Sequence, residues 1–323
     1  MRRLVFEGKE IPVNGGESVL DAIHAAGEWL SFGCRSGNCQ TCMVRAVEGT
    51  PPAEAQAGLS EGLRLSGHFL ACQARSGADI TCVRPDHDTL KWSATVISSV
   101  RVSHDILRLR FERPEGFDYR AGQYISIWRD ESVGRAYSLT SLPGEDDWLE
   151  CYVRILPDGY MSHWLANDLC RGEMLSFRGP AGDCFFHADG CEQPLLLVGS
   201  GVGMAPLTGV LRDALRSGQV GPVSIYHGVR ESADLVFDEF LSTIAMEFQG
   251  VRYTPCVGRD RSGETSVEKR LFEDLPDLAG FKVMLCGAPG VVGRLRQRIF
   301  LSGASARDIH FDEFASPAVS PGR

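Results

Sequence analysis

The sequence has no long apolar run, no basic tract and no internal repeat. None of its hydrophobic stretches approaches the roughly 18 residues that a membrane-spanning helix needs, so we expect no contact with a membrane. The net charge is −9, and the absence of Lys/Arg runs argues against a nucleic-acid surface. The first residues lack the apolar core of a signal peptide, which favours a cytoplasmic location.

What is present is the composition of a globular protein, with 43% hydrophobic and 23% charged residues. A length of 323 residues predicts about two or three domains, and we expect a monomer. The 11 cysteines are too few for a disulfide scaffold of this size. Without an export signal, they are expected to be ligands or free thiols in a reducing compartment.

Four of the cysteines have the spacing of an iron–sulfur centre. Cys34, Cys39 and Cys42 are separated by four and two residues, and Cys72 follows in a separate segment. Plant-type ferredoxins hold a 2Fe–2S cluster with four thiolates at this spacing. We therefore predict that these four cysteines are the cluster ligands.

Two other interpretations of the cysteines remain open. Structural zinc ligands usually come as two close cysteine pairs, but Cys72 has no near partner. Free cysteine is often simply buried, but the polar residues between the ligands are unlike a core. These residues are predicted to lie at the surface where a partner docks; they are Arg35, Ser36 and Asn38.

Periodicity and punctuation divide the chain into three parts. Residues 1–88 contain short strands, a helix at 19–26 capped by Ser18 and the cysteine loop, which resembles a β-grasp ferredoxin domain. A polar segment at 84–92 is predicted to be a linker. Residues 93–190 contain closely spaced strands, as in an antiparallel β-barrel of Greek-key type. The strands expected there are 93–102, 106–111, 123–129, 136–139 and 148–155.

The third part, residues 194–323, alternates strands and helices. This alternation predicts a parallel α/β sheet. We expect strands at 195–198, 223–226, 251–255 and 282–286, and helices at 207–216, 237–248 and 291–300.

A short motif in the barrel points to a flavin. Arg135, Tyr137 and Ser138, preceded by residues 121–124, match the R-x-Y-S element of the ferredoxin–NADP reductase superfamily. The resemblance implies that Arg135 binds a phosphate, Tyr137 contacts the flavin ring and Ser138 lies at N5. Those are the groups that a flavin needs from a protein.

A second segment resembles the same family. It contains Val153, Gly159, Met161 and Ser162, all predicted to contact the flavin. Ser162 is predicted to cap a helix whose free N–H groups face a pyrophosphate. Residues 179–182 match the family's barrel-closing turn.

The third part carries the corresponding nicotinamide signals. Gly201, Gly203 and Pro206 follow an apolar strand and open a helix, which suits a pyrophosphate at a helix N-terminus. They resemble the family's G-x-G-x-A-P element. Arg230 is predicted to lie near the adenosine ribose, where Glu231 would repel a 2′-phosphate. NADH is therefore expected, with NADPH left possible.

Two further elements complete the family resemblance. Cys286, Gly287 and Pro289 resemble its C-G-x-P element beside the nicotinamide. Asp312 and Phe314 resemble its carboxylate-x-aromatic terminus, although the chain continues for nine residues past Phe314. The resemblance implies that Phe314 covers the flavin. The implied catalytic residues are Ser138, Cys286 and Asp312.

Taken together, nearly the whole chain resembles the reductase components of bacterial multicomponent aromatic-ring oxygenases. It is most similar to the naphthalene- and terephthalate-dioxygenase type, whose N-terminal ferredoxin favours FAD over FMN. The resemblance implies that electrons pass from NADH through FAD to the 2Fe–2S cluster. A Rieske-type ferredoxin or the terminal oxygenase component would then accept them, in the catabolism of aromatic hydrocarbons.

Other functions remain compatible with the sequence. The same architecture serves di-iron monooxygenases and a deoxysugar-forming reductase. From a different class, the chain could be a redox-sensing or regulatory protein without turnover, or a zinc-binding interaction module.

Overall fold

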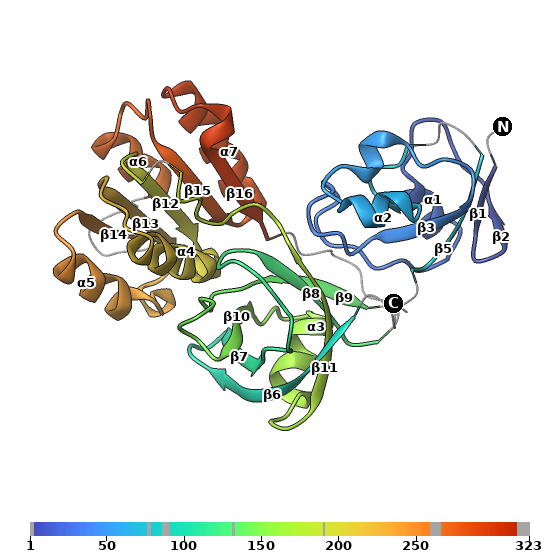
Figure 1. Ribbon diagram of the computed structural model, residues 1–323, viewed down its shortest axis with the longest axis horizontal. Coiled ribbons are helices and arrows are strands. Elements are labelled where there is room, and N and C mark those ends of the chain that lie inside the picture. Colours follow the sequence, from blue (N-terminus) through green and yellow to red (C-terminus); the bar gives the residue numbers. More distant parts are fainter. Residues whose placement is uncertain are drawn as a thin grey trace.

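The computed structural model describes residues 3–75, 79–85, 91–130, 133–189, 191–258 and 266–314. Within these ranges the strands form three separate sheets, and each sheet has its own hydrophobic core. Figure 1 shows the three parts, with the C-terminal parallel sheet on the left, the barrel below and the N-terminal sheet on the right. The predicted linker falls largely on residues 86–90, and these lie outside the described residues, as does the tail after Phe314.

The N-terminal sheet is mixed, because β1 pairs parallel to β5 while its other pairings are antiparallel. This arrangement is the predicted β-grasp. The strand order is β2-β1-β5-β3-β4. The strands are β1 (Leu4–Phe6), β2 (Lys9–Ile11), β3 (Met43–Glu48), β4 (His68–Leu70) and β5 (Ile80–Val83).

Local sequence explains the helices of this part. Helix α1 (Val19–Ala25) begins where the Ser18 side chain accepts from the backbone N–H of Asp21, as predicted. Helix α2 (Glu61–Leu65) and the 3₁₀ turn η1 (Ala53–Gln56) were not predicted. Helix α2 buries no residue, so it carries no apolar periodicity that a sequence could reveal.

The second sheet is wholly antiparallel, in the order β10-β7-β6-β11-β8-β9. A bridge between Leu139 and Cys151 joins its two edges, which closes the predicted barrel. The strands are β6 (Trp92–Arg101), β7 (Ile106–Glu112), β8 (Tyr124–Trp128), β9 (Gly134–Ser138), β10 (Trp148–Arg154) and β11 (Met174–Ala181). Between β10 and β11 the chain forms helix α3 (Tyr160–His163) and the π-helical η2 (Trp164–Asp168).

One predicted turn of the barrel is wrong in detail. Residues 179–181 form the end of β11, where Ala181 pairs with Tyr124 of β8 after a register shift that begins at Arg178. Glycine and proline favour turns in sequence, but a strand irregularity accommodates them equally well.

The third sheet is parallel throughout, in the order β14-β13-β12-β15-β16, as predicted for an α/β domain. Its strands are β12 (Leu195–Ser200), β13 (Val223–Val229), β14 (Val251–Val257), β15 (Lys282–Gly287) and β16 (Ile309–Glu313). Its helices are α4 (Met204–Arg216), α5 (Asp238–Glu247), α6 (Val267–Asp274) and α7 (Pro289–Leu301), with the short turns η3 (Gly201–Gly203), η4 (Ser232–Asp234) and η5 (Ala306–Asp308).

One helix and one strand of this part escaped prediction. Helix α6 has only eight residues, of which Val267 and Leu271 are buried and Phe272 is partly buried, so its apolar face is short. Strand β16 has only one fully buried residue, Ile309, and reads as a polar segment. It is nevertheless held by β15 along its whole length.

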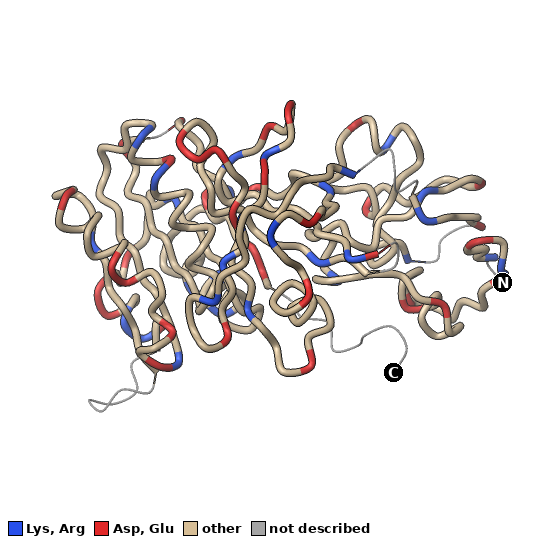
Figure 2. Tube along the Cα trace, turned by 90° about the horizontal axis from the view of Figure 1, so that it is seen from below, with Lys and Arg blue, Asp and Glu red and all other residues tan. Residues whose placement is uncertain are grey.

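Charge is distributed evenly over the described part of the chain. Figure 2 shows acidic and basic residues interspersed over all three parts. Among the described residues, no helix is long and apolar enough to cross a membrane.

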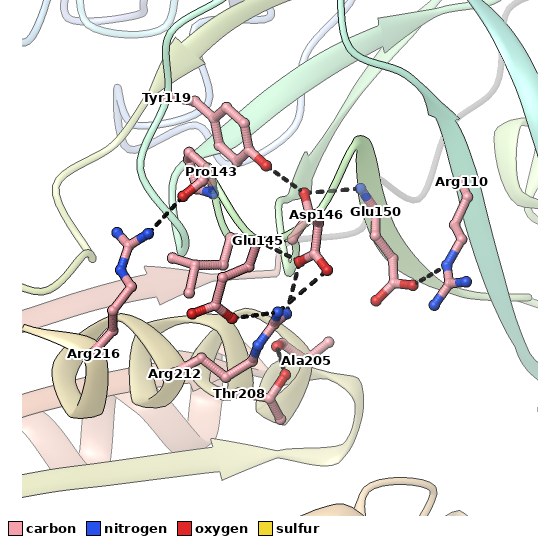
Figure 3. A network of polar contacts seen from close by, with 12 residues as sticks. Arg110, Tyr119, Pro143, Glu145, Asp146, Glu150, Ala205, Thr208, Arg212 and Arg216 are labelled. Carbon is pink, nitrogen blue, oxygen red and sulfur yellow. Dashed lines mark hydrogen bonds and ion pairs between the residues drawn. The ribbon is translucent and has the colours of Figure 1, made fainter.

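A polar network fastens helix α4 to the barrel. Arg212 donates to both carboxylate oxygens of Asp146, at 2.7 and 3.2 Å, and to Glu145 at 2.9 Å (Figure 3). One turn further on, Arg216 donates to the carbonyl of Pro143 at 2.8 Å. This fork geometry fixes helix α4 and its parallel sheet against the barrel, because a planar bidentate contact defines both the distance and the angle between the two groups.

We predict that Arg212→Met weakens this junction. The side chain of Asp146 is only 15% exposed, so removing its cation leaves a poorly solvated carboxylate. The expected cost is about 1–2 kcal/mol, between the values for exposed and buried ion pairs, and thermal unfolding of the folded chain measures it. Lys269→Met is the matched control, because Lys269 and its partner Glu273 lie within helix α6 and are 65% and 56% exposed, so its loss should cost less. Equal losses for the two variants would contradict the assignment.

Candidate functional site

The loop that carries three of the cysteines curls around its own sulfur atoms. The backbone N–H groups of Ser36 and Cys39 donate to Sγ of Cys34, at 3.4 and 3.2 Å. The N–H of Cys34 donates in return to Sγ of Cys39, at 3.3 Å. Gly37 permits this curl with a φ of +87°, where a Cβ would lie 3.0 Å from the Gln73 side chain.

The four cysteines form two contacting pairs. Hydrogen bonding from the Cys39 thiol lowers the pKa of Cys34 to about 5, and the Cys42 thiol likewise lowers the pKa of Cys72 to about 7. The thiols that donate have pKa values well above the ordinary range. Four sulfurs together, with loop N–H groups directed at them, are the donor set that a 2Fe–2S cluster requires.

The cysteine loop packs against strand β8 of the barrel. The Tyr124 hydroxyl donates to the carbonyl of Asn38 in a short hydrogen bond, and Ser126 Oγ donates to the carbonyl of Cys39 at 3.3 Å. Residues two apart on a strand share a face, so β8 holds two consecutive carbonyls of the loop. The Asn38 carbonyl therefore faces the barrel, while the residues Arg35, Ser36 and Asn38 are exposed, as predicted.

A second contact joins the N-terminal sheet to strand β9. Ser31 Oγ both accepts from the N–H of Gly134 and donates to its carbonyl, each at 3.0 Å. Nη1 of Arg135 adds bonds to Ser31 Oγ at 3.3 Å and to the Gly134 carbonyl at 2.8 Å. The residue predicted to bind a flavin phosphate thus also contacts the N-terminal part.

The three predicted catalytic residues lie close together, although they come from different sheets. Ser138, at the end of β9, donates to Oδ2 of Asp312 at 2.5 Å. Asp312 is the cross-strand neighbour of Cys286 in the parallel pair β15–β16. Burial raises the pKa of Asp312 to about 6, although the Ser138 hydrogen bond opposes this. Ser138 in turn pairs across the sheet with Tyr124.

The second predicted flavin segment differs from expectation at its cap. Helix α3 begins after Gly159, and Ser162 lies inside it. Ser162 Oγ accepts from the N–H of Leu156 at 3.1 Å and donates to the carbonyl of Gly159 at 3.0 Å. The hydroxyl therefore closes the preceding turn. Val153 and Met161 place their side chains in the barrel core.

The glycine turn after β12 is fitted closely to the neighbouring strand. A Cβ on Gly203 would lie 2.2 Å from the carbonyl of Cys286, so only glycine allows this approach. The turn leads into α4, in whose first turn Pro206 is buried. His227 donates from Nε2 to the carbonyl of Gly201 at 3.0 Å, and burial lowers its pKa to about 4. A neutral His227 thus fixes a turn that suits a pyrophosphate.

The remaining predicted residues surround the end of β15. Gly287 has a φ of +137° and is buried, and its carbonyl accepts from the N–H of Phe314 at 2.8 Å. Phe314 packs partly buried against the core of the third sheet. Pro289 opens α7 and is exposed. Arg230 is likewise exposed, just after β13.

A cavity of about 390 Å³ lies where the three parts meet. Its walls come from the cysteine loop, the barrel and β16, and include Asn38, Tyr124, Cys184 and Asp312. Sequence reasoning missed the joining residues Ser31, Tyr124 and Ser126, together with Cys184. Tyr124 stands in the G-Q-Y stretch before R-x-Y-S, which was the one available signal; the others carry none.

Known domain families match the three parts in the same order. The 2Fe-2S iron-sulfur cluster binding domain matches residues 5–76, the oxidoreductase FAD-binding domain residues 93–186, and the oxidoreductase NAD-binding domain residues 197–297. With the geometry above, they define an NAD(P)H-dependent iron–sulfur flavoprotein oxidoreductase. The domain matches confirm the prediction of a 2Fe–2S cluster, FAD and a nicotinamide nucleotide. They do not support the interpretation as a zinc-binding module or as a non-enzymatic protein.

Full-length relatives place the chain more narrowly. It is 30% identical to the ferredoxin–NAD(P)⁺ reductase component of naphthalene 1,2-dioxygenase/salicylate 5-hydroxylase systems from Ralstonia sp., over 98% of this chain and 99% of that one. It is 32% identical to the reductase subunit of an aromatic O-demethylase from Amycolatopsis sp., over 95% and 96%. A solved Amycolatopsis cytochrome P450 reductase has a TM-score of 0.68 and 30% identity, over 97% and 99%. The chain belongs to this family of oxygenase-system reductases.

We predict that Tyr124→Phe slows electron flow between the barrel and the cysteine loop. The substitution keeps the ring but removes the hydroxyl that holds the Asn38 carbonyl, a hydrogen bond of about 1 kcal/mol. Reduction of the iron–sulfur chromophore should slow by up to about fivefold, the equivalent of that energy, while flavin reduction by NADH is unchanged. Stopped-flow absorbance separates the two phases.

Tyr119→Phe is the matched control for this variant. Tyr119 loses a comparable hydroxyl contact, to Ser141 Oγ at 2.8 Å, but within the barrel. It should leave both phases unchanged. A slow iron–sulfur phase in both variants, or in neither, would contradict the role of Tyr124.

We further predict a pH-dependent stability contribution from Asp312. Its folded pKa of about 6 exceeds the ordinary value of 3.8, so folding binds its proton more tightly. The stabilisation is complete below pH 3.8 and is lost as pH rises through about 6. Asp312→Asn can still accept from Ser138, and should therefore raise the thermal midpoint relative to wild type more at pH 7.5 than at pH 5. A difference independent of pH would show that Asp312 does not titrate in this range.

Proposed function

We propose that this chain takes electrons from NADH and delivers them to a Rieske-type ferredoxin or directly to the terminal component of an oxygenase system that acts on aromatic compounds. When bound, FAD accepts a hydride and releases its electrons singly, and a 2Fe–2S cluster carries one electron at a time. One observation carries the proposal: the β8–β9 hairpin contacts the cysteine loop through Tyr124 and Asp312 through Ser138.

We propose that residues on the cluster side act as ligands and spacers. Cys34, Cys39, Cys42 and Cys72 hold the cluster, in agreement with their pairing and with the loop N–H groups around Cys34. The hydrogen bond from Tyr124 keeps the loop against the barrel. The domain bounds 1–88, 93–190 and 194–323 fit the separate sheets, and limited proteolysis is the direct way to find them.

On the flavin side, we propose that residues of this chain orient the bound groups. The Ser138 hydroxyl, held by Asp312, would face the flavin, and the neighbouring Cys286 would face the nicotinamide. Arg135 and the turn at Gly159 would bind phosphate oxygens, and Tyr137 and Phe314 would contact the ring. Such fixed positions lower the entropic part of the barrier to hydride transfer.

On the nucleotide side, Gly201, Gly203 and Pro206 form the pyrophosphate turn at the start of α4. Gly287 and Pro289 lie beside it, at the end of β15 and the start of α7. We propose NADH as the donor, because the exposed pair Arg230–Glu231 offers a 2′-phosphate one cation and one repelling carboxylate.

A cytochrome P450 is the second candidate acceptor. The observation that favours it is the 32% identity to an aromatic O-demethylase reductase subunit and the likeness to a cytochrome P450 reductase. Reconstitution of the chain with each class of acceptor distinguishes the two, because only the cognate acceptor should be reduced at a catalytic rate.

The central test is Cys42→Ser. We expect the variant to keep NADH-dependent reduction of a dye that accepts hydride equivalents from the flavin, but to lose nearly all reduction of a ferredoxin acceptor. In the wild type, anaerobic titration with NADH should bleach the flavin and iron–sulfur bands, with NADPH less effective. Cys82→Ser is the matched control, because Cys82 is buried in the same sheet on β5 and lies outside the loop. Intact ferredoxin reduction by Cys42→Ser would refute the relay.

A further inference from the structure

Two buried cysteines meet beside the predicted catalytic residues. The Sγ atoms of Cys184 and Cys286 lie 3.6 Å apart, and the residues are 2% and 0% exposed. Cys184 follows strand β11 of the barrel, whereas Cys286 lies on β15 of the parallel sheet. The contact therefore joins two different parts of the chain at the cavity where the cysteine loop also lies.

The backbone holds both thiols in place. A Cβ on Gly122 would lie 2.2 Å from the carbonyl of Cys184, so the two main chains are in direct contact. Cys286 is paired on both sides within the sheet, with Gly199 and with Asp312. Neither sulfur is carried on a free loop end, and their proximity is a property of the folded chain.

The two thiols differ in how a small solute reaches them. Cys184 lines the cavity of about 390 Å³, together with Tyr124 and Asp312. Cys286 lies behind it, where burial, and then the Cys184 thiol, raises its pKa well above the usual range. Cys184 is therefore the first thiol that a reagent in the cavity meets, and Cys286 is placed to react with the product.

We propose that Cys184 and Cys286 form a reversible disulfide that closes the nicotinamide side of the catalytic site. Hydrogen peroxide is the oxidant: it converts the Cys184 thiol to a sulfenic acid and releases one water. The Cys286 thiol then attacks that sulfur, the S–O bond breaks, and a second water leaves with the remaining thiol proton. Two electrons pass to peroxide in all, and a dithiol reductant returns them with two protons.

The disulfide would act at two levels. It removes the thiol that we place beside the nicotinamide, so its effect on activity rests on the proposed function. It also links the barrel covalently to the parallel sheet, which fixes the distance between the predicted flavin and nucleotide segments. Small displacements of reacting groups can cost about 100-fold in rate, so we expect a loss of that order.

The experiment uses the full chain with its cluster and flavin bound. After brief treatment with hydrogen peroxide, free thiols are alkylated and peptides are mapped by mass spectrometry. We expect a linked peptide pair containing residues 184 and 286 that disappears on reduction with dithiothreitol. NADH-dependent dye reduction should fall by about 100-fold and recover with dithiothreitol, while the iron–sulfur absorption stays unchanged.

Variants at two positions separate this site from the other cysteines. Cys184→Ala should form no linked peptide and keep its dye reduction after peroxide, and Cys184→Ser should behave alike if the alanine variant folds poorly. Cys256→Ala is the matched control, because Cys256 is a buried thiol of the same parallel sheet and should leave the response intact.

The outcomes discriminate clearly. Absence of the linked peptide in the wild type, or equal inactivation of Cys184→Ala, overturns the proposal. If the linked peptide forms but dye reduction does not fall, the claim that the disulfide closes the nicotinamide side of the site is overturned. Flavin reduction by NADH in the untreated wild type tests the proposed function separately, so the two failures cannot be confused.

Discussion

The contact between the cysteine loop and the β8–β9 hairpin is the constraint on which the rest of the structure depends. Electron tunnelling decays steeply with distance, so a relay needs its centres held close. Here the chain uses hydroxyl groups on one side and main-chain carbonyls on the other, from Tyr124 to Asn38 and from Ser126 to Cys39. Both carbonyls belong to the loop that carries Cys34, Cys39 and Cys42, so the contact holds the ligand loop itself against the barrel.

The same hairpin also fixes the other end of the relay. Ser138 lies across the strand pair from Tyr124 and bonds Asp312 of the parallel sheet. The Arg212 fork to Asp146 holds that sheet on the barrel from a second direction. Two anchors prevent rotation about either one, so the barrel serves as the rigid frame between the other two parts. Buried polar contacts of this kind favour one arrangement, because breaking them leaves groups without partners.

Sequence predicted the features that are local or that repeat a known spacing. The ligand spacing from Cys34 to Cys42, the Ser18 cap and the parallel alternation of the third sheet all follow from short-range rules. The Ser162 cap failed because a serine that closes the turn before a helix looks the same in sequence as one that caps it. Ser31, Ser126 and Cys184 were invisible for another reason. Their partners lie about 90–100 residues away, and a single sequence carries no sign of such pairs.

The hydrogen bonds from the barrel to the Asn38 and Cys39 carbonyls have a consequence for where an acceptor protein can contact the cysteine loop. The carbonyl side of the loop contacts the barrel, whereas Arg35 is exposed and does not line the cavity between the three parts. An acceptor that docks at this exposed side of the loop need not displace the barrel. The contact with the barrel and this exposed side chain are therefore on different parts of the loop, and a surface for an acceptor need not coincide with the surface that the barrel covers.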